Sequence, residues 1–433
     1  MKRINEYVAQ SYIRSKPIRN VGILLAGNAL KLGLGFLASA LTYRALSPAD
    51  AGRFTLVLSL VGLFSLFAEF GFRDAAVNFI AGAKSEEEAL SVAHSFLVGK
   101  ILFGTLAAVL LALLAGWILN SWYLNVVSAD LLRFAALSLL TGGLLNYAQT
   151  LLEARQTFGA LSLISAAQSV VRAAAIAALF FTGRIALWPL IALEVSIPVV
   201  LLLYGSRFLP PSYRVPRRAD SILSTRATFA RLWRFSRWIA VAAVASTIFL
   251  RLDVLLLGHF RPEAEVGLYG VALALLSKFE VFQNAILTTA FPEACRYKTK
   301  HELRAYVFRT FRLTGIASAG FLILIPFARW LVPLLYGNIY AAASLPFTLL
   351  LIGFVVSLNT QPASFVLYSL DRPKWIAAGD VAQLIFNAAL AFWLIPLLGA
   401  TGAAVAVLAT RIFGGALTAA MVGWSLYERP IHH

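Results

Sequence analysis

Long apolar runs separated by short polar connections extend along most of the chain. Apolar runs of about 18 residues or more recur from Val21 to the C-terminus, and a transmembrane helix needs about 20 such residues. The pattern therefore predicts an all-α integral membrane protein with twelve transmembrane helices. The expected spans are residues 21–43, 54–72, 94–118, 130–152, 160–182, 185–205, 236–257, 266–291, 310–332, 341–368, 375–396 and 400–424.

The longest polar connection separates the first six spans from the last six. It contains Pro210, Pro211 and many arginines, a composition that favours a solvated linker. We therefore expect an N-terminal lobe over residues 1–205 with spans one to six, a basic cytoplasmic linker over 206–235, and a C-terminal lobe over 236–433 with spans seven to twelve.

The two expected lobes resemble each other at one register. Residues 47–54, after the first span, are similar to residues 261–269, after the seventh, and Gly52 falls on Gly267 at an offset of 215 residues. Six spans in each lobe keep both copies in the same orientation across the membrane. The similarity therefore predicts two six-helix lobes related by a parallel pseudo-twofold repeat, with a cavity where they meet.

Charge sets the expected orientation. The chain is 60% hydrophobic and only 13% charged, with a net charge of +17, whereas a soluble protein carries about 25% charged residues. Lysine and arginine are concentrated in the N-terminal tail, in the central linker and after the eighth span. Such loops stay on the cytoplasmic side, so both termini are expected there.

The composition also excludes two possibilities. Because the basic residues cluster in loops between apolar spans, a soluble nucleic-acid-binding protein is excluded. Cys295 is the only cysteine, which excludes an intramolecular disulfide.

Several cations lie inside the predicted spans. A charge at the bilayer centre costs about 2.5–3.5 kcal/mol unless it faces water or a partner. We therefore predict a cationic lumen that binds an anionic substrate. Its candidate residues are Lys31, Arg172, Lys278, Arg411 and, near the outer end of the seventh span, Arg251. For Arg251, a local pair with Asp253 is an alternative.

Uncharged polar side chains form stripes along one face of several spans. The candidates for a polar lumen are Asn28, Asn146, Gln149, Gln168, Gln383 and Asn387. Side chains of this kind also form hydrogen bonds between membrane helices, and this alternative stays open. Lys100 and Arg133 lie near span ends, where we expect their side chains to reach the interface.

Five acids inside spans are candidates for coupling transport to an ion. They are Glu69, Glu194, Asp253, Glu280 and Asp380. A carboxylate in apolar surroundings can carry a proton, and it can equally serve as the counter-ion of a lumen cation.

Short motifs in a fixed order carry a family resemblance, among them Glu265-Val-Gly-Leu-Tyr269. The motifs lie at residues 43–52, 69–72, 251–258, 265–269, 291–293, 335–337, 371–374 and 395–404. Together they resemble the lipid-linked oligosaccharide flippases of the polysaccharide transporter family. That family belongs to the multidrug, oligosaccharidyl-lipid and polysaccharide exporter superfamily.

The resemblance implies two six-helix lobes around a central cavity, alternating access, and neither a cofactor nor an enzymatic activity. The implied substrate is an undecaprenyl-pyrophosphate-linked oligosaccharide, flipped across the bacterial inner membrane for O-antigen, capsule or exopolysaccharide synthesis. A polysaccharide polymerase, a chain-length regulator and a coupling ion, either proton or sodium, are the implied partners.

Two other functions stay open. A multidrug or cation antiporter of the same superfamily would also have twelve spans, but its cavity should be acidic. A membrane-embedded polysaccharide polymerase or glycosyltransferase would usually need a large external loop with catalytic residues, and the predicted external connections are short. The sequence contains no nucleotide-binding loop, metal-ligand spacing or nucleophile–base set.

Overall fold

The computed structural model describes the chain in five stretches. These are residues 31–69, 72–214, 244–297, 299–370 and 372–428. All regular secondary structure in these stretches is helical, which confirms the predicted all-α class.

The first half of the chain begins, within the described residues, with a helix over 31–45. Its further elements are α2 (Pro48–Glu69), α3 (Phe72–Ala81), α4 (Glu86–Trp122), α5 (Ala129–Ala154), α6 (Phe158–Phe181), α7 (Leu187–Gly205), the 3-10 helix η1 (Ser206–Phe208) and α8 (Pro211–Arg214). Serine caps fix two of the starts, because Ser85 and Ser128 accept hydrogen bonds from free amides in the first turns of α4 and α5, at 3.2 and 3.3 Å.

The second half begins with a helix over residues 244–260. Its further elements are α10 (Glu263–Arg296), α11 (Lys300–Ile323), α12 (Ala328–Tyr336), the 3-10 helix η2 (Asn338–Ala343), α13 (Ser344–Ser369) and α14 (Pro373–Glu428). A capping box starts α11: Thr299 and Glu302 each accept a hydrogen bond from the other's backbone N–H.

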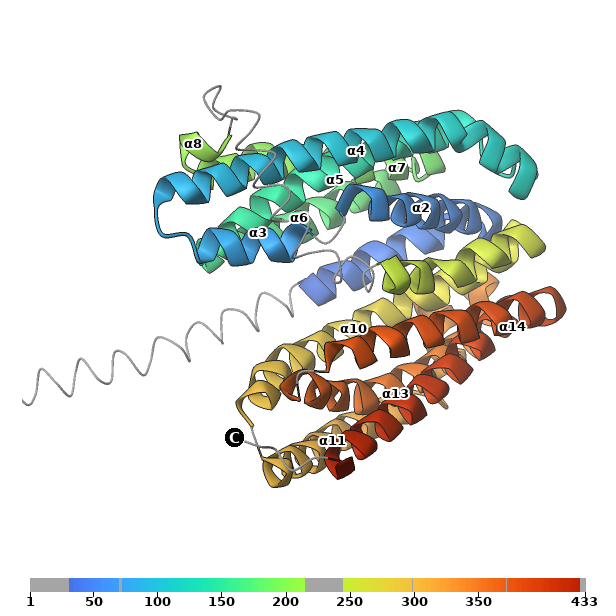
Figure 1. Ribbon diagram of the computed structural model, residues 1–433. Coiled ribbons are helices and arrows are strands. Elements are labelled where there is room, and N and C mark those ends of the chain that lie inside the picture. The colour runs from blue at the N-terminus through green and yellow to red at the C-terminus, as the bar shows by residue number, and fades with distance from the viewer. Residues whose placement is uncertain (1–30, 70–71, 215–243, 298, 371, 429–433) are drawn as a thin grey trace, which may run out of the picture.

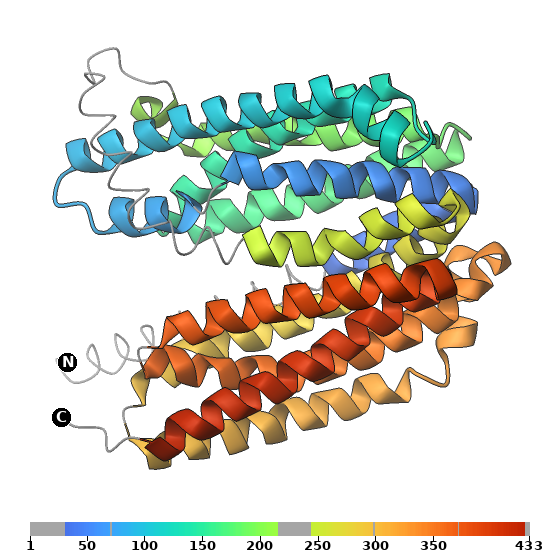
Figure 2. The ribbon, with the colours of Figure 1, turned by 45° about the vertical axis from the view of Figure 1, so that its right-hand side comes forward.

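The helices form two layers. Figure 1 shows α2 to α7 in one layer and α10 to α14 in the other, with the helices over 31–45 and 244–260 between them. In Figure 2 the layers are closest at one end and diverge toward the end that holds α8 and the last turns of α14. A large apolar core joins the layers at the closer end, since it includes buried residues of both α2 and α10, such as Val57 and Leu275.

Most predicted spans coincide with observed helices. Eight described helices are long and apolar enough to cross a membrane, or nine if α11 and α12 form one broken span. The single element α14 contains two predicted spans, because its backbone leaves the helical conformation at Gly399. The helices over 31–45 and 244–260 adjoin residues outside the described stretches, so the count of twelve stays a prediction.

The bounds of several predicted spans differ from those of the observed helices. The predicted helix over 310–332 is broken, since α11 and α12 meet at an angle of 70°. Pro326 lies in the break, and proline ends helices because it lacks an N–H and its ring clashes with the preceding turn. The predicted helix over 54–72 instead begins at Pro48 and ends at Glu69.

A reciprocal glycine contact joins α2 to α10. A Cβ atom on Gly52 would lie 1.8 Å from the carbonyl oxygen of Glu263, and one on Gly267 would lie 1.9 Å from that of Pro48. Pro48 and Glu263 are separated by the same 215 residues as Gly52 and Gly267. Equivalent residues of the predicted repeat therefore make equivalent contacts, and the approach is too close for any side chain.

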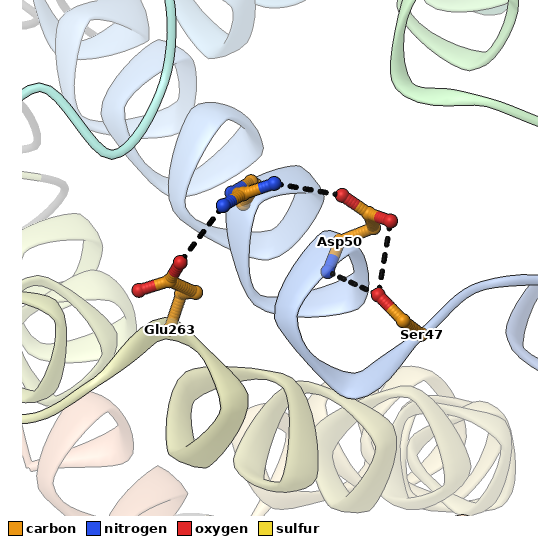
Figure 3. A network of polar contacts seen from close by, with 4 residues as sticks. Ser47, Asp50 and Glu263 are labelled. Carbon is orange, nitrogen blue, oxygen red and sulfur yellow. Dashed lines mark hydrogen bonds and ion pairs between the residues drawn. The ribbon is translucent and has the colours of Figure 1, made fainter.

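A network of polar contacts also links the start of α2 to the start of α10 (Figure 3). Arg53 of α2 bridges Asp50 at 3.1 Å and Glu263 of α10 at 2.9 Å. Ser47 donates to the Asp50 carboxylate at 2.9 Å and accepts from its backbone N–H at 3.1 Å. The network fixes the start of α2 and links it to the start of α10.

Candidate functional site

A cavity of about 160 Å³ lies where the helix over 31–45, α2, α6, α7 and α10 meet. Its charged lining residues are Arg172 from α6, Glu194 from α7 and Lys278 from α10. The Arg172 Nη2 atom lies 2.6 Å from Glu194 Oε2, and the two side chains are 39% and 22% exposed. We call this space the cationic cavity.

Lys278 gives the cationic cavity its surplus of positive charge. Within the described part of the chain, this lysine forms no ion pair and no hydrogen bond, and its charge interacts with that of Arg172. The helix over 31–45 packs closely upon it, because a Cβ on Gly35 would lie 3.6 Å from Lys278 Nζ. Two cations and one carboxylate leave a net positive charge, which favours an anion.

Two neighbouring cavities lie inside the second half of the chain. One, of about 230 Å³, is bounded by α13 and both parts of α14. The other, of about 240 Å³, is bounded by the same elements and the helix over 244–260. We call them the α13/α14 cavities. The residues that line both are Gln361, Asp380, Gln383 and Arg411.

The structure assigns the predicted lumen cations to different places. Arg172 and Lys278 line the cationic cavity, whereas Arg411 lines the α13/α14 cavities. Lys31 lies one helical turn before Gly35 but lines neither the cationic cavity nor the α13/α14 cavities. Arg251 packs on α2, since a Cβ on Gly62 would lie 2.6 Å from its Nε atom.

Asp253 and Asn387 are buried in helix contacts. The Asp253 carboxylate accepts hydrogen bonds from the Tyr269 hydroxyl and, at 2.8 Å, from the backbone N–H of Val254. Asn387 Oδ1 accepts from Thr410 Oγ1 at 3.3 Å. These contacts join the helix over 244–260 to α10 and the two parts of α14 to each other. Packing therefore accounts for Asp253 and for the Asn387 oxygen, while Asn387 Nδ2 is buried with no hydrogen-bond partner among the described residues.

The remaining candidates do not line the cationic or α13/α14 cavities. They are Glu69, Asn146, Gln149, Gln168 and Glu280. Asn28 lies outside the described residues. Gln361 is absent from the predicted sites, although a glutamine beside Pro362 in the middle of an apolar run is a visible signal.

Lys100 contradicts the expectation that its side chain reaches the interface. Its side chain is only 2% exposed, and its Nζ atom lies 3.9 Å from Glu69 Oε1 and 5.5 Å from the centre of the Phe96 ring. The expectation fails because α4 begins at Glu86, well before the predicted start of the span, so that Lys100 lies far inside the helix.

Curated relatives match most of the chain. A lipid III flippase of Escherichia coli strain K12 is 24% identical over 401 residues, which cover 89% of this chain and 93% of the relative. A protein of Haloferax volcanii, named as a probable low-salt glycan biosynthesis flippase, is 22% identical over 390 residues and covers 88% of this chain and 78% of its own length.

Solved structures show the same fold. The inward closed lipid II flippase MurJ superposes with a TM-score of 0.73 at 14% identity, covering 92% of this chain and 87% of that protein. An inward-facing multidrug resistance MATE transporter gives a TM-score of 0.64 at 13% identity, covering 92% of this chain and 96% of that protein. The chain is therefore a multi-pass membrane protein with the fold of these transporters.

The sequence also matches one family over much of its length. The family described as "Polysaccharide biosynthesis protein" matches residues 18–298. This match covers more than half of the chain and includes both glycines of the α2–α10 contact and both cations of the cationic cavity. It confirms the resemblance carried by the sequence motifs, and the chain belongs to the polysaccharide biosynthesis protein family.

Proposed function

We propose that this protein is a flippase for an oligosaccharide linked to undecaprenyl pyrophosphate, acting in O-antigen, capsule or exopolysaccharide synthesis. The observation that carries the proposal is the cationic cavity, where Arg172 and Lys278 come from different halves of the chain and only Arg172 is paired with a carboxylate, Glu194. Surplus positive charge favours an anionic headgroup and disfavours the cationic substrates of a drug antiporter. The names of the flippase relatives support the same function.

We further propose that the chain forms two six-helix lobes, over residues 1–205 and 236–433, joined by the linker over 206–235. The reciprocal contact of Gly52 and Gly267 supports a pseudo-twofold relation between the lobes, because both halves of the contact obey one offset. Each lobe then moves as a unit around the cationic cavity.

Alternating access follows from this arrangement. If the basic loops are cytoplasmic, the α2–α10 contact lies at the external end of the molecule and the layers diverge toward the cytoplasm (Figure 2). The diphosphate headgroup enters from the cytoplasm and binds the cationic cavity. Separation of Gly52 from Gly267 then opens the external side and releases the substrate.

The charged residues of the cationic cavity have different roles in this proposal. Arg172 has a planar fork of donors that can hold a phosphate through two parallel hydrogen bonds, whereas Lys278 acts as a point charge. Glu194 neutralises Arg172 in the empty protein and is displaced by the phosphate. Lys31 and Arg251 do not line the cavity, and we expect their charges to add to its positive potential.

Completing the transport cycle requires an energy source and an acceptor. A proton or sodium ion that binds an embedded carboxylate, with Glu69 and Glu280 as candidates, would return the lobes to the inward-facing state. A polysaccharide polymerase and a chain-length regulator would use the flipped unit.

The proposal is tested in a strain that lacks its own flippase. Arg172→Ala and Lys278→Ala should each abolish most surface polysaccharide, whereas Arg304→Ala, an exposed arginine on α11, should not. Membrane levels of every variant are measured alongside. Normal polysaccharide in the Arg172→Ala/Lys278→Ala double variant would contradict the proposal, and drug resistance without restored polysaccharide would favour the antiporter.

A further inference from the structure

The α13/α14 cavities contain two opposite charges that are not paired. Arg411 and Asp380 line both spaces, yet neither forms an ion pair or a hydrogen bond within the described part of the chain. The Arg411 guanidinium lies 5.0 Å from the centre of the Phe249 ring. Both side chains are half-buried, and a charge inside a membrane protein is costly unless it faces water or a partner, so a polar occupant that contacts both groups would stabilise this part of the structure.

The surrounding side chains are also polar. Gln361 and Gln383 line both cavities, and Thr360 and Thr418 line the one of about 230 Å³. Trp375 and Tyr368 contribute aromatic surface to the same wall. Apolar side chains such as Leu417 and Phe249 also line the cavities, so the lining combines polar groups with apolar surface, whereas a lipid tail would leave the polar groups without partners.

The chemistry of the lining selects for a neutral polyol. Asp380 repels an anion, and Arg411 repels a cation. An ionised Asp only accepts hydrogen bonds, Arg only donates them, and Gln does both. Sugar hydroxyls also donate and accept, so adjacent hydroxyls can contact Asp380, Gln383 and Arg411 together. The apolar faces of a sugar ring can lie against an aromatic side chain.

Two glycines make room for this polar lining. A Cβ on Gly414 would lie 2.1 Å from Gln383 Oε1, and one on Gly415 would lie 2.8 Å from Thr360 Cγ2. Gln383 Nε2 donates to the carbonyl oxygen of Gly379 at 3.4 Å. The close packing holds the Gln383 amide in one position, as expected of a site that is formed before its ligand binds.

We propose that the α13/α14 cavities bind a sugar residue of the lipid-linked oligosaccharide, whereas the cationic cavity binds its diphosphate. This inference rests on the proposed flippase function. The two sites share no lining residue, so the recognition of sugar and of phosphate can be separated by mutation. Arg411 then belongs to the sugar subsite and not to the phosphate site.

The test compares two lipids on the purified full-length protein in nanodiscs. Binding constants are measured for undecaprenyl pyrophosphate and for the same lipid carrying the oligosaccharide repeat unit of the source strain. Gln383→Ala and the isosteric Asp380→Asn should each weaken binding of the sugar-bearing lipid by about tenfold, the expected effect of losing a hydrogen bond that involves a charged or buried group. Both variants should bind the sugar-free lipid as the unchanged protein does.

Arg172→Ala serves as the contrasting variant, because it should weaken binding of both lipids. Unchanged binding of the sugar-bearing lipid to Gln383→Ala and Asp380→Asn would overturn the sugar subsite and leave cavities that hold only water. Unchanged binding of both lipids to Arg172→Ala would instead contradict the proposed function. A third variant, Thr418→Val, keeps the size of the side chain and serves if Gln383→Ala or Asp380→Asn fails to fold. It should weaken binding of the sugar-bearing lipid and leave binding of the sugar-free lipid unchanged.

Discussion

Among single side chains, we expect Glu194 to control how much of the Arg172 charge a substrate can use. The two groups lie 2.6 Å apart in the cationic cavity. We predict that Glu194→Gln binds undecaprenyl pyrophosphate several-fold more tightly, because a neutral amide competes less well for the guanidinium than a carboxylate does. Equilibrium binding measures the change.

Glu153→Gln is the matched control for this prediction. Glu153 pairs with Arg73 at the same 2.6 Å distance, but it lies outside the cationic cavity. Its neutralisation should leave the binding constant unchanged. Equal binding constants for the Glu194→Gln variant and the unchanged protein would show that Glu194 does not compete with the substrate.

The mid-span charges were visible in the sequence, but their grouping was not. Helical spacing shows which face of a helix carries Arg172 or Arg411, and it does not show which neighbouring helix covers that face. The structure therefore separates these two arginines, although the sequence suggested one lumen. The burial of Lys100 was missed for a related reason, since α4 extends well beyond its apolar core.

At the scale of helices, α2 and α10 approach most closely at Gly52 and Gly267, where backbone meets backbone. We predict that Gly52→Ala prevents this closure, because its Cβ would lie 1.8 Å from the carbonyl oxygen of Glu263. An added cysteine at Ser39, a lining residue of the cationic cavity, should then react faster with an impermeant external thiol reagent in a variant without Cys295.

The control for this closure prediction is Gly142→Ala, since a Cβ on Gly142 of α5 has no atom within 4 Å. Alanine also favours a helix over glycine by about 0.5–1 kcal/mol, so helix propensity cannot explain a loss of closure. Equal labelling rates in the Gly52→Ala and Gly142→Ala variants would refute the role of the glycine pair.

Gly399 permits the break in α14. Its φ of 59° and ψ of −133° are not helical, and a Cβ there would meet the Glu265 carboxylate. Glu265 also accepts a hydrogen bond from the backbone N–H of Ala400 at 3.2 Å. We predict that Gly399→Ala lowers the free energy of unfolding by about 1–3 kcal/mol, measured by thermal unfolding in detergent against Gly423→Ala.

Gly423 is a suitable control because its surroundings leave space for a Cβ. Similar thermal stability of both variants would mean that the break in α14 needs no glycine. The apolar pattern predicted helices on both sides of this break. Pro326 marked a candidate kink in the predicted span over 310–332, but the pattern did not predict a full break, because a proline inside a helix can bend it or end it, and packing decides which.

For the whole molecule, orientation follows from the basic loops. We predict that a cysteine replacing Asn125, between α4 and α5, is labelled from outside intact cells. A cysteine replacing Lys84, between α3 and α4, should be labelled only after the membrane is opened. Both positions are exposed, so access across the membrane and not burial determines the result. Labelling of Lys84→Cys in intact cells would invert the proposed topology.

The layered helical fold was largely predictable from the sequence, because the apolar runs and the repeat around Gly52 and Gly267 are properties of the chain itself. The conformation of the molecule, with the two layers closest at one end, was not predictable. Which end is closed depends on contacts between helices far apart in sequence, such as the hydrogen bond from Tyr340 to the carbonyl oxygen of Leu46 at 3.0 Å.

The central claim is that Arg172 and Lys278 hold the diphosphate during transport of a lipid-linked oligosaccharide. Flipping of the labelled lipid by purified protein in liposomes tests it most directly, with Arg304→Ala as the control. The unchanged protein and the control should move the lipid. The Arg172→Ala/Lys278→Ala double variant should be at least about tenfold slower, as expected from the loss of charged hydrogen bonds. Equal rates for the double variant and the unchanged protein would contradict the claim.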